Sequence, residues 1–241
     1  MDIPTIYEDE YLLVADKPAG LVVNVSENAR NNTLQDWAVK KLGLENRADS
    51  SGNPQFYQRA GIVHRLDKET SGLILIARDP ESFDNLQQQF KARTVSKSYS
   101  ALAHGKINNM TQAVKVPVGR LPWNRRLFGI LPEGREAETE IAVTAFYTDG
   151  REEFTLLEAQ PKTGRTHQIR IHLKHLGHPL VGDPLYTGRK IYRNDRNFCP
   201  RLFLHAAYIA FRHPHSDRNL QFTSPLPPDL KKCLENLTKE N

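Results

Sequence analysis

The sequence predicts an α+β protein, a single domain with a central mixed, mostly antiparallel sheet flanked by helices and loops. Apolar runs of strand length are interspersed with amphipathic helical patterns along most of the chain. An Asp-Gly turn joins two segments of strand type, which is typical of an antiparallel hairpin. No Gly/Ser-rich linker, internal repeat or low-complexity block divides the 241 residues, which favours one domain.

The elements of the N-terminal half follow from local signals. Asp79 is an expected N-cap, Pro80 suits the first helical position and Glu81 suits the positive end of the helix dipole. Residues 45–60 are polar and contain Ser-Ser-Gly-Asn-Pro, so a loop is expected there. The expected strands lie within 6–16, near 21–23, and at 72–77 and 97–103, and the expected helices lie at 33–42 and from 80 onward.

The C-terminal half is predicted in the same way. Residues 105–138 hold three prolines and four glycines, so this stretch is expected to be rich in loops. Thr166 is an expected cap of the next helix, which Gly177 and Pro179 would stop. The expected elements are a hairpin of strands 139–147 and 153–159, a helix at 167–176, a strand at 202–211 and a helix at 229–237.

Composition bounds the kind of protein. Hydrophobic residues make up 39% of the chain, and the mean hydropathy is −0.57. No stretch approaches the roughly 18–20 apolar residues that span a bilayer, and no basic-then-apolar leader opens the sequence. The two cysteines are too few for a disulfide framework or a four-cysteine zinc site. We therefore expect a cytoplasmic protein without a membrane span.

Basic charge is concentrated in one segment. The formal net charge is +5, yet residues 159–223 hold eleven Lys/Arg and three acids, so this segment carries +8 and the rest −3. Such a concentration indicates a polyanionic partner, for example nucleic acid. The alternative is a solvated basic face without a partner.

Three polar patches could carry chemistry. The first, residues 61–72, places His, Arg, Asp, Lys, Glu, Thr and Ser between two apolar strands. A carboxylate beside cations stays ionised at neutral pH, which suits a nucleophile or a base. The second is Lys97-Ser98-Tyr99, and the third, residues 164–172, is an anion-facing helix start. The alternatives are a polar turn with surface ion pairs, a core tyrosine and a capped surface helix.

Other kinds of site find little support. His172, His175 and His178 are spaced by three, but no acid lies between the first two and no cysteine pair is near, so no metal site is expected. Walker-type phosphate loops, Gly-x-Gly-x-x-Gly turns and Gly-x-Ser-x-Gly elbows are absent from the sequence.

At these three patches the sequence resembles the RluA family of RNA pseudouridine synthases. Residues 64–72 read His-Arg-Leu-Asp-Lys-Glu-Thr-Ser-Gly and match the family's His-Arg-Leu-Asp-x-x-Thr-Ser-Gly signature, and Lys97-Ser98-Tyr99 matches its Lys-x-Tyr motif. Residues 164–170 match the third motif, and segments 13–20, 176–183 and 201–206 add support. The resemblance covers about residues 7–229.

The resemblance implies isomerisation of uridine to pseudouridine in RNA, with no metal and no organic cofactor. Asp67 would be the essential carboxylate, acting as nucleophile or as base. Tyr99 would stack on the flipped uracil, and Arg170 would pair with Asp67. Arg65 would enter the RNA stack. The remaining expected substrate-binding residues are His64, Thr70, Arg165, His167 and Gln168.

The expected partner is RNA, either large-subunit rRNA or tRNA, and the expected state is a monomer. Many relatives carry an N-terminal RNA-binding module of the S4 type, which is not expected within residues 1–241. RNA selection would then depend on residues 45–60, 106–135 and 189–201. Two alternatives stay open: a glycosidase-like nucleotide hydrolase that uses Asp67, and an RNA-binding or RNA-chaperone protein on the same fold.

Overall fold

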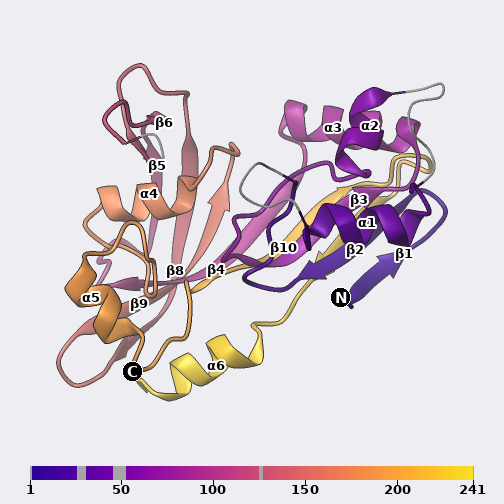
Figure 1. Ribbon diagram of the computed structural model, residues 1–241. Coiled ribbons are helices and arrows are strands. Elements are labelled where there is room, and N and C mark those ends of the chain that lie inside the picture. The colour runs from indigo at the N-terminus through magenta and orange to yellow at the C-terminus, as the bar shows by residue number, and fades with distance from the viewer. Residues whose placement is uncertain (1, 26–30, 46–52, 125–126, 241) are drawn as a thin grey trace. The chain divides into compact units, whose positions relative to one another are not determined.

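The computed structural model describes residues 2–25, 31–45, 53–124 and 127–240. Within these ranges, helices and predominantly antiparallel strands confirm the predicted α+β class. The chain forms two compact units: unit 1 comprises residues 1–96 and 208–224, and unit 2 comprises 97–207 and 225–241 (Figure 1). That residues 1–241 act as a single catalytic domain stays a prediction.

Unit 1 contains a sheet in the order β1-β2-β3-β10, and β11 pairs with β10. The pairs β1–β2, β2–β3 and β10–β11 are antiparallel, with Val14 opposite Leu75. All seven residues of β3 are buried, as the apolar run predicts. The strands are β1 Thr5–Glu8, β2 Leu12–Lys17, β3 Ser71–Ala77, β10 Leu204–Arg212, which begins in unit 2, and β11 Asn219–Thr223.

The helices of unit 1 are α1 Leu34–Leu42, α2 Pro54–Arg59 and α3 Pro80–Ala92. The predicted cap of α3 is confirmed, since Asp79 accepts a hydrogen bond from the backbone N–H of Ser82. The loop predicted for 45–60 is wrong over α2, where Asn53 caps a short helix that starts at Pro54. Residues 46–52 of that loop lie outside the described ranges. Helices α2 and α3 pack on β2 and β3 through one apolar cluster that includes Phe56, Phe83, Leu86, Leu12, Val14, Leu73 and Leu75.

Unit 2 contains a sheet in the order β10-β4-β9-β8-β12, and β5 pairs with β8. The predicted hairpin is confirmed: β8 and β9 are antiparallel, and Gly150 in their turn has a φ of +87°. The loop-rich prediction for 105–138 missed three short strands. The strands are β4 Ser96–His104, β5 Thr111–Lys115, β6 Val118–Arg120, β7 Phe128–Ile130, β8 Glu138–Thr148, β9 Glu153–Pro161 and β12 Thr238–Lys239.

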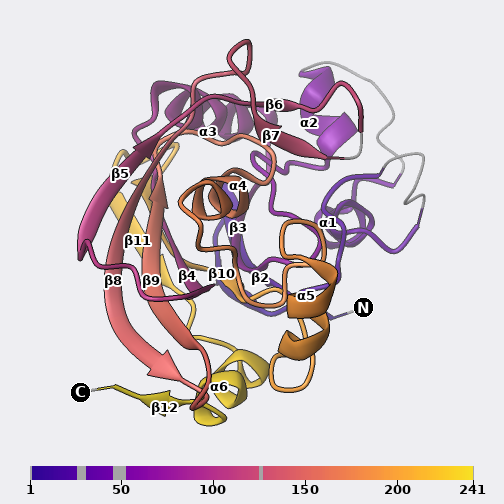
Figure 2. The ribbon, with the colours of Figure 1, turned by 90° about the vertical axis from the view of Figure 1, so that its left-hand side faces the viewer.

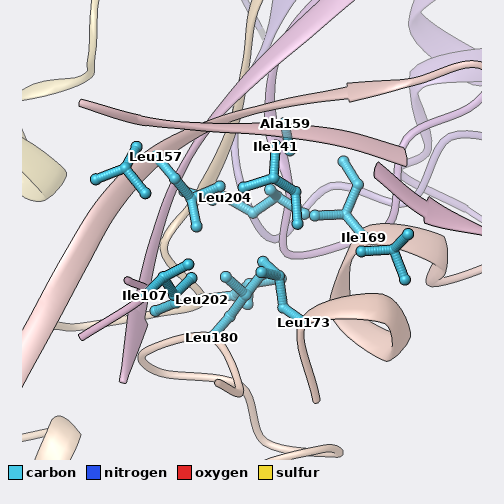
Figure 3. Close-up of a cluster of buried hydrophobic side chains, with 13 residues drawn as sticks. Ile107, Ile141, Leu157, Ala159, Ile169, Leu173, Leu180, Leu202 and Leu204 are labelled. Carbon is cyan, nitrogen blue, oxygen red and sulfur yellow. The ribbon is translucent and has the colours of Figure 1, made fainter. Parts of the chain in front are cut away.

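The helices of unit 2 are α4 Gln168–His175, α5 Arg189–Asp195, which was not predicted, and α6 Pro228–Glu235. Helix α4 lies inside the curve of β8 and β9 (Figure 2). Its Ile169 and Leu173 point into the main apolar core of the unit, against Ile141, Leu157 and Leu204 (Figure 3). This core fixes which face of α4 turns away from the sheet.

None of the helices among the described residues is long and apolar enough to cross a membrane. Both cysteines, Cys199 and Cys233, are buried and free of disulfide bonds.

Candidate active site

The first motif lies in the irregular segment that runs from Gly61 to the start of β3 in unit 1. Gly61 begins it with a φ of +73°, and a Cβ at this position would lie 2.1 Å from the carbonyl oxygen of Ala77. Only glycine fits such a close approach. The backbone N–H of Ala77 donates to the Gly61 carbonyl over 2.8 Å. The start of the segment is thereby attached to the end of β3.

The side chain of His64 accepts a hydrogen bond from the backbone of β3. The backbone N–H of Leu75 donates to its Nε2 over 3.0 Å, and its ring stacks on Phe90 with centroids 4.7 Å apart. A nitrogen that accepts a backbone N–H carries no proton of its own, so the imidazole is neutral in this arrangement. His64 therefore fixes the backbone on which Arg65 and Asp67 follow.

Lys17 supports the other side of the segment. Its side chain is fully buried at the end of β2, and its Nζ donates to the carbonyl oxygens of Pro18, Leu21 and Lys68 over 2.9, 2.9 and 3.2 Å. The backbone N–H of Gly20 donates to the same Lys68 carbonyl over 2.8 Å. A buried ammonium thus joins the 17–21 turn to the residue that directly follows Asp67.

The chemically active groups of the first motif differ in exposure. Arg65 is exposed, and Asp67 is half-buried at the start of a turn in which the Thr70 N–H donates to the Asp67 carbonyl over 3.2 Å. Thr70 is only 2% exposed, and its hydroxyl has no hydrogen-bond partner among the described residues. A buried hydroxyl without a partner is costly.

Arg170 of α4 forms a buried bidentate ion pair with Asp183 in unit 2. Its Nε and Nη2 lie 2.8 Å from Oδ2 and Oδ1, and the two residues are 3% and 0% exposed. Asp183 Oδ1 also accepts the backbone N–H groups of Leu185 and Tyr186 over 2.9 and 3.2 Å. The ring of Tyr186 lies 5.0 Å from the guanidinium carbon. The guanidinium is therefore fixed on its fork by a carboxylate and on its face by an aromatic ring.

The start of α4 differs from the prediction. Thr166 does not cap the helix; His167 is the N-cap, with a φ of +56° and no side-chain capping bond. Its Nδ1 lies 2.8 Å from the hydroxyl of Tyr186, which also accepts the backbone N–H of Phe128 over 3.3 Å. This tertiary contact favours a left-handed backbone over a local Thr cap.

Both the oxygen and the nitrogen of the Gln168 side-chain amide form hydrogen bonds within the protein. The side-chain oxygen accepts from the Thr163 hydroxyl and the Arg165 N–H, and the side-chain nitrogen donates to the Glu138 carbonyl and the Thr139 hydroxyl, over 2.7 to 3.0 Å. Arg165 is half-buried, and its Nε donates to the Glu136 carbonyl over 3.0 Å. Gln168 thus ties the third motif to β8.

The second motif lies on β4, where Tyr99 pairs with Ala159 of β9. Tyr99 is half-buried and packs against the apolar core of unit 2. Burial lowers the pKa of the neighbouring Lys97 ammonium.

The three histidines spaced by three, two on α4 and His178 after it, do not form a cluster. His172 Nε2 lies 3.2 Å from the Val116 carbonyl, and His178 Nδ1 lies 2.8 Å from the His104 carbonyl, while His175 is exposed. Within the described ranges, no group of three or more His, Cys, Asp or Glu could hold a metal ion.

The expected site residues therefore fall into two sets. Unit 1 presents His64, Arg65, Asp67 and Thr70 on one segment, and unit 2 presents Tyr99 on β4 and the third motif at α4. The convergence of Asp67 with Tyr99 and Arg170 stays a prediction. The sequence reasoning assigned no role to Lys17, Asp183 or Tyr186. Their only signal was their position in or next to segments 13–20 and 176–183, which carried part of the family resemblance.

The third motif thus holds a buried arginine–carboxylate pair, and the first motif holds Asp67 in a segment that is hydrogen-bonded on both sides. Comparison with known proteins shows the family to which the chain belongs. Residues 11–175 match the family model of RNA pseudouridylate synthases. The chain is 36% identical over 239 residues to an uncharacterized RNA pseudouridine synthase, YlyB, of Bacillus subtilis, covering 99% of this chain and 74% of that protein. It is 39% identical to ribosomal large subunit pseudouridine synthase D of Nitrosomonas europaea, covering 95% of this chain and 64% of that protein.

Solved structures agree. The human RNA pseudouridylate synthase domain containing 1 protein has a TM-score of 0.75 and 25% identity, covering 99% of this chain and 89% of that chain. The chain thus belongs to the RNA pseudouridylate synthase family, and the expectation of an isomerase acting on RNA is confirmed at the level of that family. It spans about two thirds to three quarters of the length of the two curated relatives named here.

Proposed function

We propose that this chain isomerises uridines of ribosomal RNA to pseudouridine, with Asp67 as the essential carboxylate. The main support is the way Asp67 is presented: His64 fixes the backbone before it, and the buried Lys17 ammonium holds the residue after it. A carboxylate that reacts with a bound nucleotide needs such a fixed position, because small displacements cost much of the rate.

The reaction breaks the N1–C1′ bond, turns the uracil and joins C5 to C1′, after which C5 loses its proton and N1 gains one. It is redox-neutral, and it conserves the composition of the RNA. Asp67 acts as nucleophile or as base, and either role requires the ionised form. In our proposal Arg170 faces Asp67 and stabilises that form. Asp183 binds two of the five N–H donors of the guanidinium.

The target base has to leave the RNA stack before it can react. Arg65 is exposed, as a side chain that replaces the base in the stack needs to be, and Tyr99 stacks on the extruded uracil. Thr70, Arg165 and His167 contact the nucleotide. We assign His64 and Gln168 to positioning, because their polar atoms bind the protein itself.

Relatives named for the large ribosomal subunit favour rRNA over tRNA as the target. In our proposal the enzyme works as a monomer in the cytoplasm, where ribosomal RNA is processed, with residues 1–241 as its catalytic domain. Light scattering tests the monomer, and mapping of pseudouridines in total RNA with and without the gene identifies the target.

The exchange of Asp67 for Asn tests the chemistry. Asp67→Asn should abolish release of tritium from [5-³H]uridine in rRNA, while RNA binding changes by no more than about tenfold, or ~1.4 kcal/mol. Glu69→Gln removes the same charge two residues away and should retain activity. Measurable pseudouridine formation by Asp67→Asn would remove this residue from the centre of the mechanism, and release of free uracil by the wild type would indicate a hydrolase instead.

A further inference from the structure

Helix α5 carries an arginine stripe, defined here as Arg189, Arg193 and Arg196. These positions are spaced i, i+4 and i+7, so the three side chains leave one face of the helix. All three residues are exposed, as is the neighbouring Lys190. The stripe is about 10 Å long, from seven residues at roughly 1.5 Å each.

Within the described part of the chain, no acidic side chain neutralises this stripe. Arg196 donates to the carbonyl of Pro200, an uncharged partner. Among the described residues, no acidic side chain pairs with Arg189, Lys190 or Arg193. Like charges at i, i+4 destabilise a helix, and the first turn of α5 also places cations where the helix dipole favours anions. This arrangement of cations therefore lowers the stability of the helix by itself, whereas an anionic partner would explain it.

The segment that carries the stripe is nevertheless held rigidly at both ends. Asp195, the last residue of α5, is 1% exposed and accepts the Gly182 N–H over 2.8 Å, with His104 Nε2 3.2 Å away. At the other end, Asp183 binds the backbone N–H groups of Leu185 and Tyr186. A buried carboxylate at each end turns a basic segment into a fixed platform.

The same anchor reaches the candidate active site. Asp183 forms the bidentate pair with Arg170, and Gly182 beside it has a φ of +70°, where a Cβ would lie 2.2 Å from the Arg201 carbonyl oxygen. The stripe and the Arg170 guanidinium are thus parts of one rigid arrangement within unit 2, with α5 in front of the rest of that unit in Figure 2.

We propose that the α5 arginine stripe binds the phosphate backbone of the RNA substrate outside the nucleotide that reacts, and so fixes where the RNA lies relative to Arg170. Phosphates recur every few ångströms along a strand, so a 10 Å stripe can contact about three of them. This inference rests on the proposed function in taking RNA as the partner.

The test is the salt dependence of RNA binding by the full chain. The probe is a large-subunit rRNA transcript, and the variant is Arg189→Gln/Arg193→Gln/Arg196→Gln. Losing three contacts should lower the slope of log Kd against log salt by about 2 and weaken binding by roughly 100-fold at 0.1 M salt, at about 0.7 per phosphate.

Lys231→Gln/Lys232→Gln/Lys239→Gln is the matched control, since it removes the same charge from exposed positions on and after α6 of the same unit. A slope equal to that of the wild type in the stripe variant overturns the proposal, and so does an equal loss in the control variant. If the wild type forms no pseudouridine, the proposed function fails, but the binding slopes still decide the role of the stripe.

Discussion

The buried pair of Arg170 and Asp183 gives the sharpest stability prediction. Arg170→Met keeps most of the side-chain length but leaves the Asp183 carboxylate in a site that is 0% exposed. Removing one member of a buried ion pair costs about 3–5 kcal/mol. Asp183 retains two backbone N–H donors, so we take the lower value, about 3 kcal/mol. At roughly 2–4 °C per kcal/mol for a chain of this size, the Tm should fall by about 6–12 °C.

Thermal melts followed by circular dichroism, together with urea titrations, measure this loss independently of RNA. Arg165→Met is the matched control, because this half-buried arginine donates from Nε to one neutral carbonyl; it should cost no more than about 1 kcal/mol. Arg170→Met/Asp183→Leu removes both charges and should recover part of the lost stability. A Tm of Arg170→Met within about 2 °C of the wild type would refute the reasoning.

Three further predictions follow from buried polar groups. Lys17→Met removes the ammonium donor from three carbonyls, of which, among the described residues, only that of Lys68 retains another donor, the Gly20 N–H. The unfolding free energy should fall by about 2–4 kcal/mol in urea titrations. Lys40→Met is an exposed control, and an equal effect of both variants would contradict the assigned role. Burial holds the pKa of His172 below its ordinary value of 6.5. The unfolded chain therefore binds a proton that the folded chain does not, and the unfolding free energy falls as the pH drops below about 6.5. His172→Leu should flatten this dependence of the unfolding free energy on pH, and equal slopes in variant and wild type would count against the role of His172. Thr70→Val removes a buried hydroxyl that has no hydrogen-bond partner among the described residues, so the Tm should stay the same or rise. Pseudouridine formation should become slower. A lower Tm would mean that the hydroxyl does form a hydrogen bond in the folded protein.

The sequence predicted best those elements whose signals are local. The Asp79 cap and the Asp-Gly turn act within a few residues, and both elements formed as expected. Helix α2 was missed because six residues are too few to establish a periodic pattern, although Asn53-Pro54 is itself a start signal. Helix α5 has no apolar stripe, since its side chains face solvent or, at Asp195, a buried polar site.

The tertiary partners of the site could not be read from local pattern. Thr166 is a reasonable cap by composition, yet the contact of His167 with Tyr186 determines the backbone there. The motif identified Arg170, but its carboxylate partner lies thirteen residues further along and is brought back only by the turn at Gly182. The sequence thus named the groups expected to carry the chemistry, and the fold supplies the groups that hold them still.

The interleaved course of the chain has a consequence for its synthesis. Strand β3 ends at Ala77, but β10, its neighbour in the sheet, enters unit 1 only from Tyr208 onward. At roughly 5–20 residues per second, a ribosome needs about 7–26 s to make the intervening chain. During that interval one edge of β3, a strand that is entirely buried in the folded protein, has no pairing partner, and such edges associate readily with other chains. The nascent chain should therefore depend on a chaperone at this stage more than a protein whose sheets are completed in sequence order.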